Sequence, residues 1–363
     1  MMNKEQTEAA ITEHFRKKIR KDNKIYHASL LVHSDRLGIH LNLAEGRSAA
    51  FEIHADQPFY IASISKLFTS VLIGMLVEKG LLAYDEPISR YLDKDLLHQL
   101  HLVRGKDYTH EILIRHLLNH TSGLHCFFED RPKRVKSMID MIVDEPERTW
   151  TPLETLQWGK SHLHGHFRPG QGFHYSDTGY HLLGLIIENV MKLPFHDVIH
   201  IYIFTPLRML HSYVAPGQPS SQNEHPIARL FIRDIDVTDY DSLSFMFAGG
   251  GIVSTTEDLL RFMRALVHHE LIRSETIDTM LGDWARFFPG IDYGYGVMRF
   301  RAIPLLMPAR YQAWGNAGST GSFMFYHPAT DAYFIGSLNQ FRYHQKGIRL
   351  MMQTIDKLLK CDA

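Results

Sequence analysis

Residues 63–80 read SISKLFTSVLIGMLVEKG, with a serine and a lysine three residues apart at the head of a long apolar run. The apolar run predicts a buried helix that ends near Gly80. Residues three apart share one face of a helix, so the Ser63 hydroxyl and the Lys66 amine can meet. A serine at a helix start is also a common N-cap, and this spacing alone leaves both interpretations open.

On the N-terminal side, the chain predicts a helix over residues 4–21 and then a β-hairpin. The hairpin covers residues 25–46, where strand-type runs are split by a polar turn at 34–36. On the C-terminal side, strand-type runs return between residues 293 and 338, and a last helix is expected over 343–360. The strands therefore lie at the two ends of the chain.

The segment between these ends is mostly helical, with long polar loops. We therefore expect an α/β (α+β) domain made of residues 1–80 and 248–363. A mostly helical domain of residues 81–247 is inserted into it. The active site is expected between the two domains.

Composition excludes several classes of protein. Among the 363 residues, 45% are hydrophobic and 22% charged, which is typical of a soluble globular protein. The formal net charge of −1 favours neither nucleic acid nor an anionic membrane as a partner. We see no secretory signal and no run of about 18 apolar residues. Two distant cysteines, Cys126 and Cys361, suit a reducing compartment, so a cytoplasmic location is expected.

Two further stretches carry chemical side chains. Tyr175-Ser176-Asp177 lies in PGQGFHYSDTGYHLLG, ahead of a strongly apolar helix pattern. WGNAGSTGSF covers residues 314–323, between two predicted strands. Each motif is weak alone, and their value comes from their order along the chain.

These motifs and their order resemble the serine β-lactamase and penicillin-binding protein superfamily, on its class C β-lactamase side. IRHLLNHTSGL at residues 114–124 and GGGIVSTTEDLLRF at 249–262 add to the resemblance, which spans roughly residues 25–340. The resemblance implies an antiparallel sheet flanked by helices, with the helical insertion beside it.

The resemblance also implies roles for individual residues. Ser63 would be the nucleophile, with Lys66 and Tyr175 as its proton-transfer partners. The backbone N–H groups of Ser63 and Ser319 would form the oxyanion hole, and Gly318 would let substrate lie against the strand edge. The implied reaction is acyl transfer through an acyl-enzyme, with no cofactor.

The family usually has asparagine where this chain has Asp177. An ionised carboxylate cannot donate to a substrate carbonyl, and beside Lys66 it would favour the ammonium form and weaken that amine as a base. Either Asp177 is protonated, or it holds Lys66 as a cation while Tyr175 does more of the proton transfer. Asp177 is also a plausible cap for the helix that follows.

The family's lysine or histidine of the third motif is replaced by Asn316. A neutral amide binds a substrate carboxylate less well than a cation does, so we expect Asn316 to favour substrates without an obligatory carboxylate. Trp314-Gly315 resembles the family's esterase branch. Asn316 could instead be a turn or strand-edge residue, and Tyr175 a core tyrosine.

We expect no metal site. The run HLHGH at residues 162–166 offers histidines, but the sequence shows no acidic or cysteine partner for it. The glycines at 249–251 are interpreted as permitting tight packing. Phe127 and Phe128 could line the substrate cleft or lie in a plain surface loop.

The sequence thus predicts a serine hydrolase acting on a small ester, amide or peptide, with Asp177, Asn316 and Gly318 shaping the pocket. It predicts neither a nucleic-acid nor a membrane partner, and leaves the oligomeric state open. The alternative is a penicillin-binding-like protein with little or no catalysis, which binds peptidoglycan fragments or a partner protein.

Overall fold

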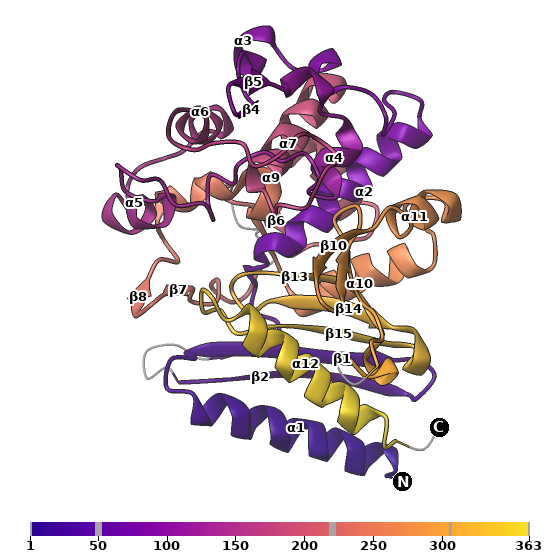
Figure 1. Ribbon diagram of the computed structural model, residues 1–363. Coiled ribbons are helices and arrows are strands. Elements are labelled where there is room, and N and C mark those ends of the chain that lie inside the picture. The colour runs from indigo at the N-terminus through magenta and orange to yellow at the C-terminus, as the bar shows by residue number, and fades with distance from the viewer. Residues whose placement is uncertain (1, 48–52, 218–222, 305–306, 362–363) are drawn as a thin grey trace.

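An eight-stranded antiparallel sheet forms the centre of the lower half of the molecule in the computed structural model, which describes residues 2–47, 53–217, 223–304 and 307–361 (Figure 1). The strands follow the order β10 (Ala285–Phe288), β11 (Ile291–Tyr293), β12 (Met298–Phe300), β13 (Trp314–Ala317), β14 (Phe323–His327), β15 (Ala332–Ser337), β1 (His27–Ser34) and β2 (Ile39–Gly46). Since β1 pairs with β15, the N-terminal hairpin completes a sheet made by the C-terminal part of the chain. The predicted antiparallel sheet built from both ends is confirmed.

Both faces of this sheet are covered by helices, so its central strands are apolar on both sides. Leu30 and Val32 of β1 and Phe334 of β15 pack in a core with helices α1 (Lys4–Lys21) and α12 (His344–Leu358). The alternate residues Leu31 and Ile335 point to the opposite core, which includes α2 (Ser65–Glu78) and α10 (Thr256–Val267). In Figure 1, α1 runs along the bottom of the view and α12, which contacts it, crosses in front of the sheet.

The middle of the chain forms the helical upper half of Figure 1. Its helices are α3 (Lys94–Leu97), α4 (Ile114–Leu118), α5 (Met138–Asp144), α6 (Pro152–His162), α7 (Asp177–Met191), α8 (Phe195–Ile199) and α9 (Phe247–Gly250), and α11 (Ser274–Met280) follows α10. Short hairpins add β4 (Leu102–Val103) with β5 (Lys106–Asp107) and β7 (Phe231–Ile232) with β8 (Ile235–Asp236). The mostly helical middle matches the prediction, and the domain boundaries at residues 80 and 247 remain predictions.

A second, three-stranded sheet joins the two halves of the fold. Its strands follow the order β3 (Phe59–Tyr60), β9 (Ile252–Ser254) and β6 (Tyr213–Val214). The pairing of β3 with β9 places the residues just before Ser63 against those just after the glycines at 249–251. None of the helices in the described ranges combines the length and the apolar character that a membrane crossing requires.

Candidate active site

Ser63 lies in a tight turn that the backbone fixes from two sides. The turn is the 3₁₀ helix Ala62–Ile64, which runs directly into α2. The N–H of Ile61 donates to the carbonyl of Ile252 at 3.0 Å, and the Ser322 hydroxyl donates to the carbonyl of Ile61 at 2.9 Å. Ala62 has a φ of 50°, a left-handed conformation that costs a non-glycine residue about 1–3 kcal/mol. The surrounding contacts therefore hold Ala62 in a strained backbone conformation directly before Ser63.

The hydroxyl of Ser63 does not cap α2, whose N-cap position is occupied by Ile64. Lys66 Nζ lies 3.3 Å from Ser63 Oγ instead. The predicted meeting of hydroxyl and amine is thus found, and the capping interpretation is wrong. The turn geometry lets Ser63 face Lys66 rather than the first N–H groups of the helix.

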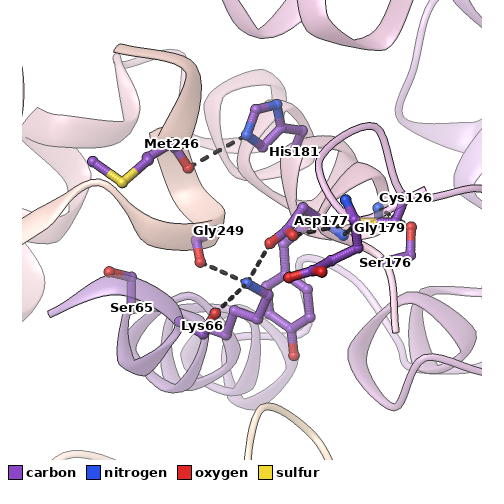
Figure 2. Close-up of polar contacts among 12 residues, drawn as sticks. Ser65, Lys66, Cys126, Ser176, Asp177, Gly179, His181, Met246 and Gly249 are labelled. Atoms are coloured by element: carbon purple, nitrogen blue, oxygen red, sulfur yellow. Dashed lines mark hydrogen bonds and ion pairs between the residues drawn. The ribbon is translucent and has the colours of Figure 1, made fainter. Parts of the chain in front are cut away.

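Lys66 is fully buried and has an acceptor for each of the three protons of an ammonium group. Besides Ser63 Oγ, these acceptors are Asp177 Oδ1 at 2.5 Å and the carbonyl of Gly249 at 2.7 Å. Figure 2 shows the amine between these two oxygens, which come from α7 and α9. A carboxylate at this distance favours the charged amine. Of the two sequence-based alternatives, the contacts favour Asp177 as the partner of a cationic Lys66.

Asp177 is the first residue of α7, and its neighbour Ser176 is the N-cap. Ser176 Oγ accepts from the N–H of Gly179 at 3.3 Å, so the interpretation of Asp177 as the cap is wrong. The second carboxylate oxygen, Oδ2, accepts from the Cys126 thiol at 3.4 Å, and the N–H of Asp177 donates to Cys126 Sγ at 3.3 Å. Burial, followed by the charge of Asp177, raises the pKa of the Cys126 thiol well above its usual value, which keeps it a neutral donor.

Tyr175 also lies close to Lys66, with its ring centroid 5.0 Å from Nζ. Burial, followed by the negative charge of Asp177, raises the pKa of the Tyr175 phenol well above its usual value, although a hydrogen bond with Ser63 acts in the opposite direction. The phenol therefore keeps its proton at neutral pH. This geometry suits a group that donates a proton to, or relays one from, the position next to Ser63.

The segment after β13 approaches the Ser63 turn closely. A Cβ on Gly318 would lie 2.3 Å from Ser322 Oγ and 2.8 Å from Ala62 Cβ, so only glycine lets the two segments meet. The next residue, Ser319, lines the same cleft as Ser63. The structure thus brings the two predicted oxyanion-hole residues to one cleft.

Asn316 is fully buried in β13 and is not among the residues that line the cleft. Its side-chain amide donates to the carbonyl of Gly296 at 2.7 Å, and its oxygen accepts from the N–H of Ala317 at 2.7 Å. Both ends of the amide are therefore used within the protein. These bonds fix the position of the Asn316 side chain within the protein, and its role in substrate binding stays a prediction.

The cleft at Ser63 is a partly open hollow. Its lining is mostly apolar and includes the predicted Phe127 and Phe128; the full set is Ala62, Ser63, Phe127, Phe128, Glu129, Asp177, Leu230, Ile232, Leu243, Phe245, Met246, Gly249, Gly250, Ser319, Thr320 and Phe341. Among these described residues none is a lysine or an arginine. The lining itself thus offers no cation for a substrate carboxylate.

Glu129 is a second carboxylate in this lining that sequence reasoning missed. Burial, followed by the charge of Asp177, raises the pKa of Glu129, while the positive charges of Lys66 and Arg342 act against this shift. The carbonyl of Gly249 and the thiol of Cys126 were missed as well. The sequence indicates only a packing role for the glycine run, and a lone cysteine or glutamate carries no spacing signal that points to a site.

A family model described as Beta-lactamase matches residues 20–354. The chain belongs to the beta-lactamase family. This match covers the sheet at both ends of the chain, the helical middle and all the residues of the cleft, so the resemblance inferred from the motifs is confirmed.

Among curated relatives of this beta-lactamase-family protein is penicillin-binding protein 4* of Bacillus subtilis, 31% identical over 260 residues, which cover 66% of this chain and 51% of the relative. The chain spans about half the length of the curated relatives it matches. A D-stereospecific amidohydrolase from Streptomyces sp. has a TM-score of 0.78 at 24% identity, over 94% of this chain and 97% of that one.

EstCE1, described as a hydrolase with promiscuous acyltransferase activity, has a TM-score of 0.78 at 19% identity, over 97% of this chain and 98% of that structure. These two solved structures show that the fold extends over nearly the whole chain.

Proposed function

We propose that this chain is a serine hydrolase that forms an acyl-enzyme on Ser63 with a small ester or amide. The observation that carries the proposal is the placement of Lys66 Nζ 3.3 Å from Ser63 Oγ, in an apolar cleft that Ser319 also lines. A serine hydroxyl needs a neighbouring group to take its proton, and Lys66 is within reach. Family membership and the hydrolases among the similar folds support the same reaction class.

In the proposed acylation, Ser63 Oγ bonds to the acyl carbon while its proton passes to the neutral form of Lys66. Tyr175 gives its phenolic proton to the leaving oxygen or nitrogen and recovers a proton from Lys66. The N–H groups of Ser63 and Ser319 stabilise the negative charge on the acyl oxygen. Water then releases the acyl group and regenerates Ser63.

Asp177 restrains this cycle in the proposed mechanism. Its contact with Lys66 at 2.5 Å engages the amine that would take the Ser63 proton. Slow acylation at neutral pH is therefore expected, relative to a variant with asparagine at this position.

The charges of the cleft favour a substrate with an amino group over one with a carboxylate. Glu129 and Asp177 both line the cleft, and Asp177 is already paired with Lys66. Glu129 is thus placed to bind a substrate ammonium, while the phenyl rings of Phe127, Phe128 and Phe245 pack on its apolar part. We propose amino-acid amides and esters with a free amino group as the preferred class, and β-lactams with their obligatory carboxylate as poor substrates.

A panel of chromogenic substrates tests this function. Wild type should hydrolyse short-chain nitrophenyl esters, and it should hydrolyse D-alanyl nitroanilide faster than its N-acetylated form. Ser63→Ala should lose both activities, while Ser65→Ala, whose hydroxyl accepts from the N–H of Ile252 in the neighbouring strand, is the matched control. If wild type and Ser63→Ala show the same rates on the whole panel, the hydrolase proposal is wrong and the alternative of a non-catalytic binder gains support.

A further inference from the structure

Three side chains from two loops, one before α5 and one between α6 and α7, converge beside the cleft. His166 Nε2 lies 2.9 Å from Asp130 Oδ2, and His174 Nε2 lies 3.1 Å from Asp130 Oδ1. Their ligand atoms all lie within 4.8 Å of one another. We propose that Asp130, His166 and His174 form a binding site for a divalent transition-metal ion, with zinc as the best match. This inference is independent of the hydrolase proposal.

The spacing of the donor atoms fits such an ion. Zinc binds imidazole nitrogen and carboxylate oxygen at about 2.0–2.1 Å, which puts neighbouring donors of a tetrahedral site about 3.3 Å apart. The Asp130–His166 and Asp130–His174 separations are only slightly shorter. Two imidazoles and one carboxylate are a common zinc ligand set, and the partial exposure of His166 (37%) leaves a side open for a water as fourth ligand.

Backbone hydrogen bonds hold the ligands in place. The N–H of His166 donates to the carbonyl of Gly123 at 2.8 Å, and the N–H of His174 donates to that of His120 at 3.0 Å. The N–H of Cys126 donates to Asp130 Oδ2 at 2.9 Å, which orients the carboxylate. Ligands that the backbone fixes in advance lose little freedom when an ion binds.

The stacking of the two imidazoles favours a metal over a purely protonated cluster. The rings of His166 and His174 stack with centroids 3.5 Å apart, and both direct Nε2 to the same carboxylate. Two imidazolium cations in this position would repel each other, whereas two neutral imidazoles can satisfy both Nε2 atoms by binding one cation. The sequence had predicted no metal for HLHGH because no acidic partner was evident, and Asp130 is that partner.

The site would also connect to the cleft. Asp130 ends the segment whose residues Phe127, Phe128 and Glu129 line the cleft, and His174 directly precedes Tyr175. A bound ion would therefore tie the cleft-lining segment to the one that carries Tyr175. Its expected role is structural, because the ligands themselves are not among the residues that line the cleft.

Binding of Co²⁺ and Zn²⁺ to the full chain, purified and stripped with a chelator, tests the proposal. We expect one ion per chain, the visible absorption of tetrahedral Co²⁺, and a rise in melting temperature on adding Zn²⁺. His166→Ala and Asp130→Asn should weaken Zn²⁺ binding at least about 10- to 100-fold. His162→Ala is the matched control, because this histidine of the same run bonds the carbonyl of Trp158 and lies outside the cluster.

A second group, His54, Asp56 and His225, also has ligand atoms within 4.8 Å of one another, so His225→Ala is a further control. Anomalous diffraction at the zinc edge from wild-type crystals locates the ion without relying on any variant. A peak between Asp130, His166 and His174 supports the proposal. Absence of binding, equal loss in His162→Ala, or a peak only at the second group would overturn it.

Discussion

Replacement of Asp177 by asparagine should speed the reaction of Ser63 at neutral pH. The carboxylate lies 2.5 Å from the fully buried Lys66 amine and favours its charged form. Asparagine keeps an oxygen near the amine but removes the charge. Lys66 should therefore take the Ser63 proton more readily in this variant.

The size of the effect follows from the charges. Two unit charges about 4 Å apart interact by about 4 kcal/mol at an effective dielectric constant of about 20, and each tenfold change in rate corresponds to about 1.4 kcal/mol. The Lys66–Asp177 pair is closer than this, but Lys66 also keeps the carbonyl of Gly249 as an acceptor. We expect the rate of Ser63 labelling at neutral pH to rise at least about tenfold in Asp177→Asn.

The assay is the second-order rate of fluorophosphonate labelling, measured at neutral pH in wild type and variant. Glu129→Gln is the matched control, because it removes one carboxylate from the same cleft without removing the partner of Lys66, so its labelling rate should change much less. A lower melting temperature is expected for Asp177→Asn, since breaking a buried pair completely costs about 3–5 kcal/mol. An unchanged labelling rate in Asp177→Asn would refute the view that this ion pair restrains Lys66.

Three further predictions follow from the cleft and the core. Glu129→Gln should raise KM for aminoacyl nitroanilides but not for simple nitrophenyl esters. In wild type, KM for the nitroanilides should rise as the pH falls through the raised pKa of Glu129, because the carboxylate is then lost. A pH-independent KM would contradict the proposed role of Glu129. Gly318→Ala should lower kcat at least about tenfold, because the added Cβ would clash with Ala62 beside the nucleophile. An unchanged kcat would show that catalysis does not depend on this close approach. Burial lowers the pKa of His27 and of His125 from the ordinary 6.5 to about 4. Below about pH 6.5 the unfolded chain therefore binds more protons than the folded one, and the free energy of unfolding should fall by about 2 kcal/mol per histidine from about pH 7 to about pH 5. A urea midpoint that stays constant over this range would refute the prediction.

The sequence predicted the large sheet well, because its strands are apolar runs separated by turns. The hairpin of β1 and β2 and the strands β14 and β15 all lie within predicted segments. The edge strand β10 was missed because its four residues, ARFF, do not alternate between apolar and polar. The sheet of β3, β9 and β6 was missed because strands of two or three residues are too short to show a period.

The candidate site was predicted where its residues are close in sequence or belong to an ordered motif, as for Ser63, Lys66 and Tyr175. Which of two neighbours caps α7 could not be read from the sequence, since Ser176 and Asp177 are both good capping residues. The burial of Asn316 could not be predicted from the sequence either, because it depends on which face of the sheet each side chain of the strand occupies.

The group of Asp130, His166 and His174 depends on contacts between loops that are far apart in sequence. No spacing rule links an aspartate to histidines 36 and 44 residues away. The structure alone brings these side chains together.

Identification of the residue that a covalent serine probe modifies tests the central claim most directly. Wild type, Ser63→Ala and the control Ser65→Ala would be treated with a fluorophosphonate and analysed by intact-protein mass spectrometry and peptide mapping. The account predicts a single adduct on Ser63 in wild type and Ser65→Ala, and none in Ser63→Ala. An adduct on another residue, or equal labelling of Ser63→Ala, would contradict it.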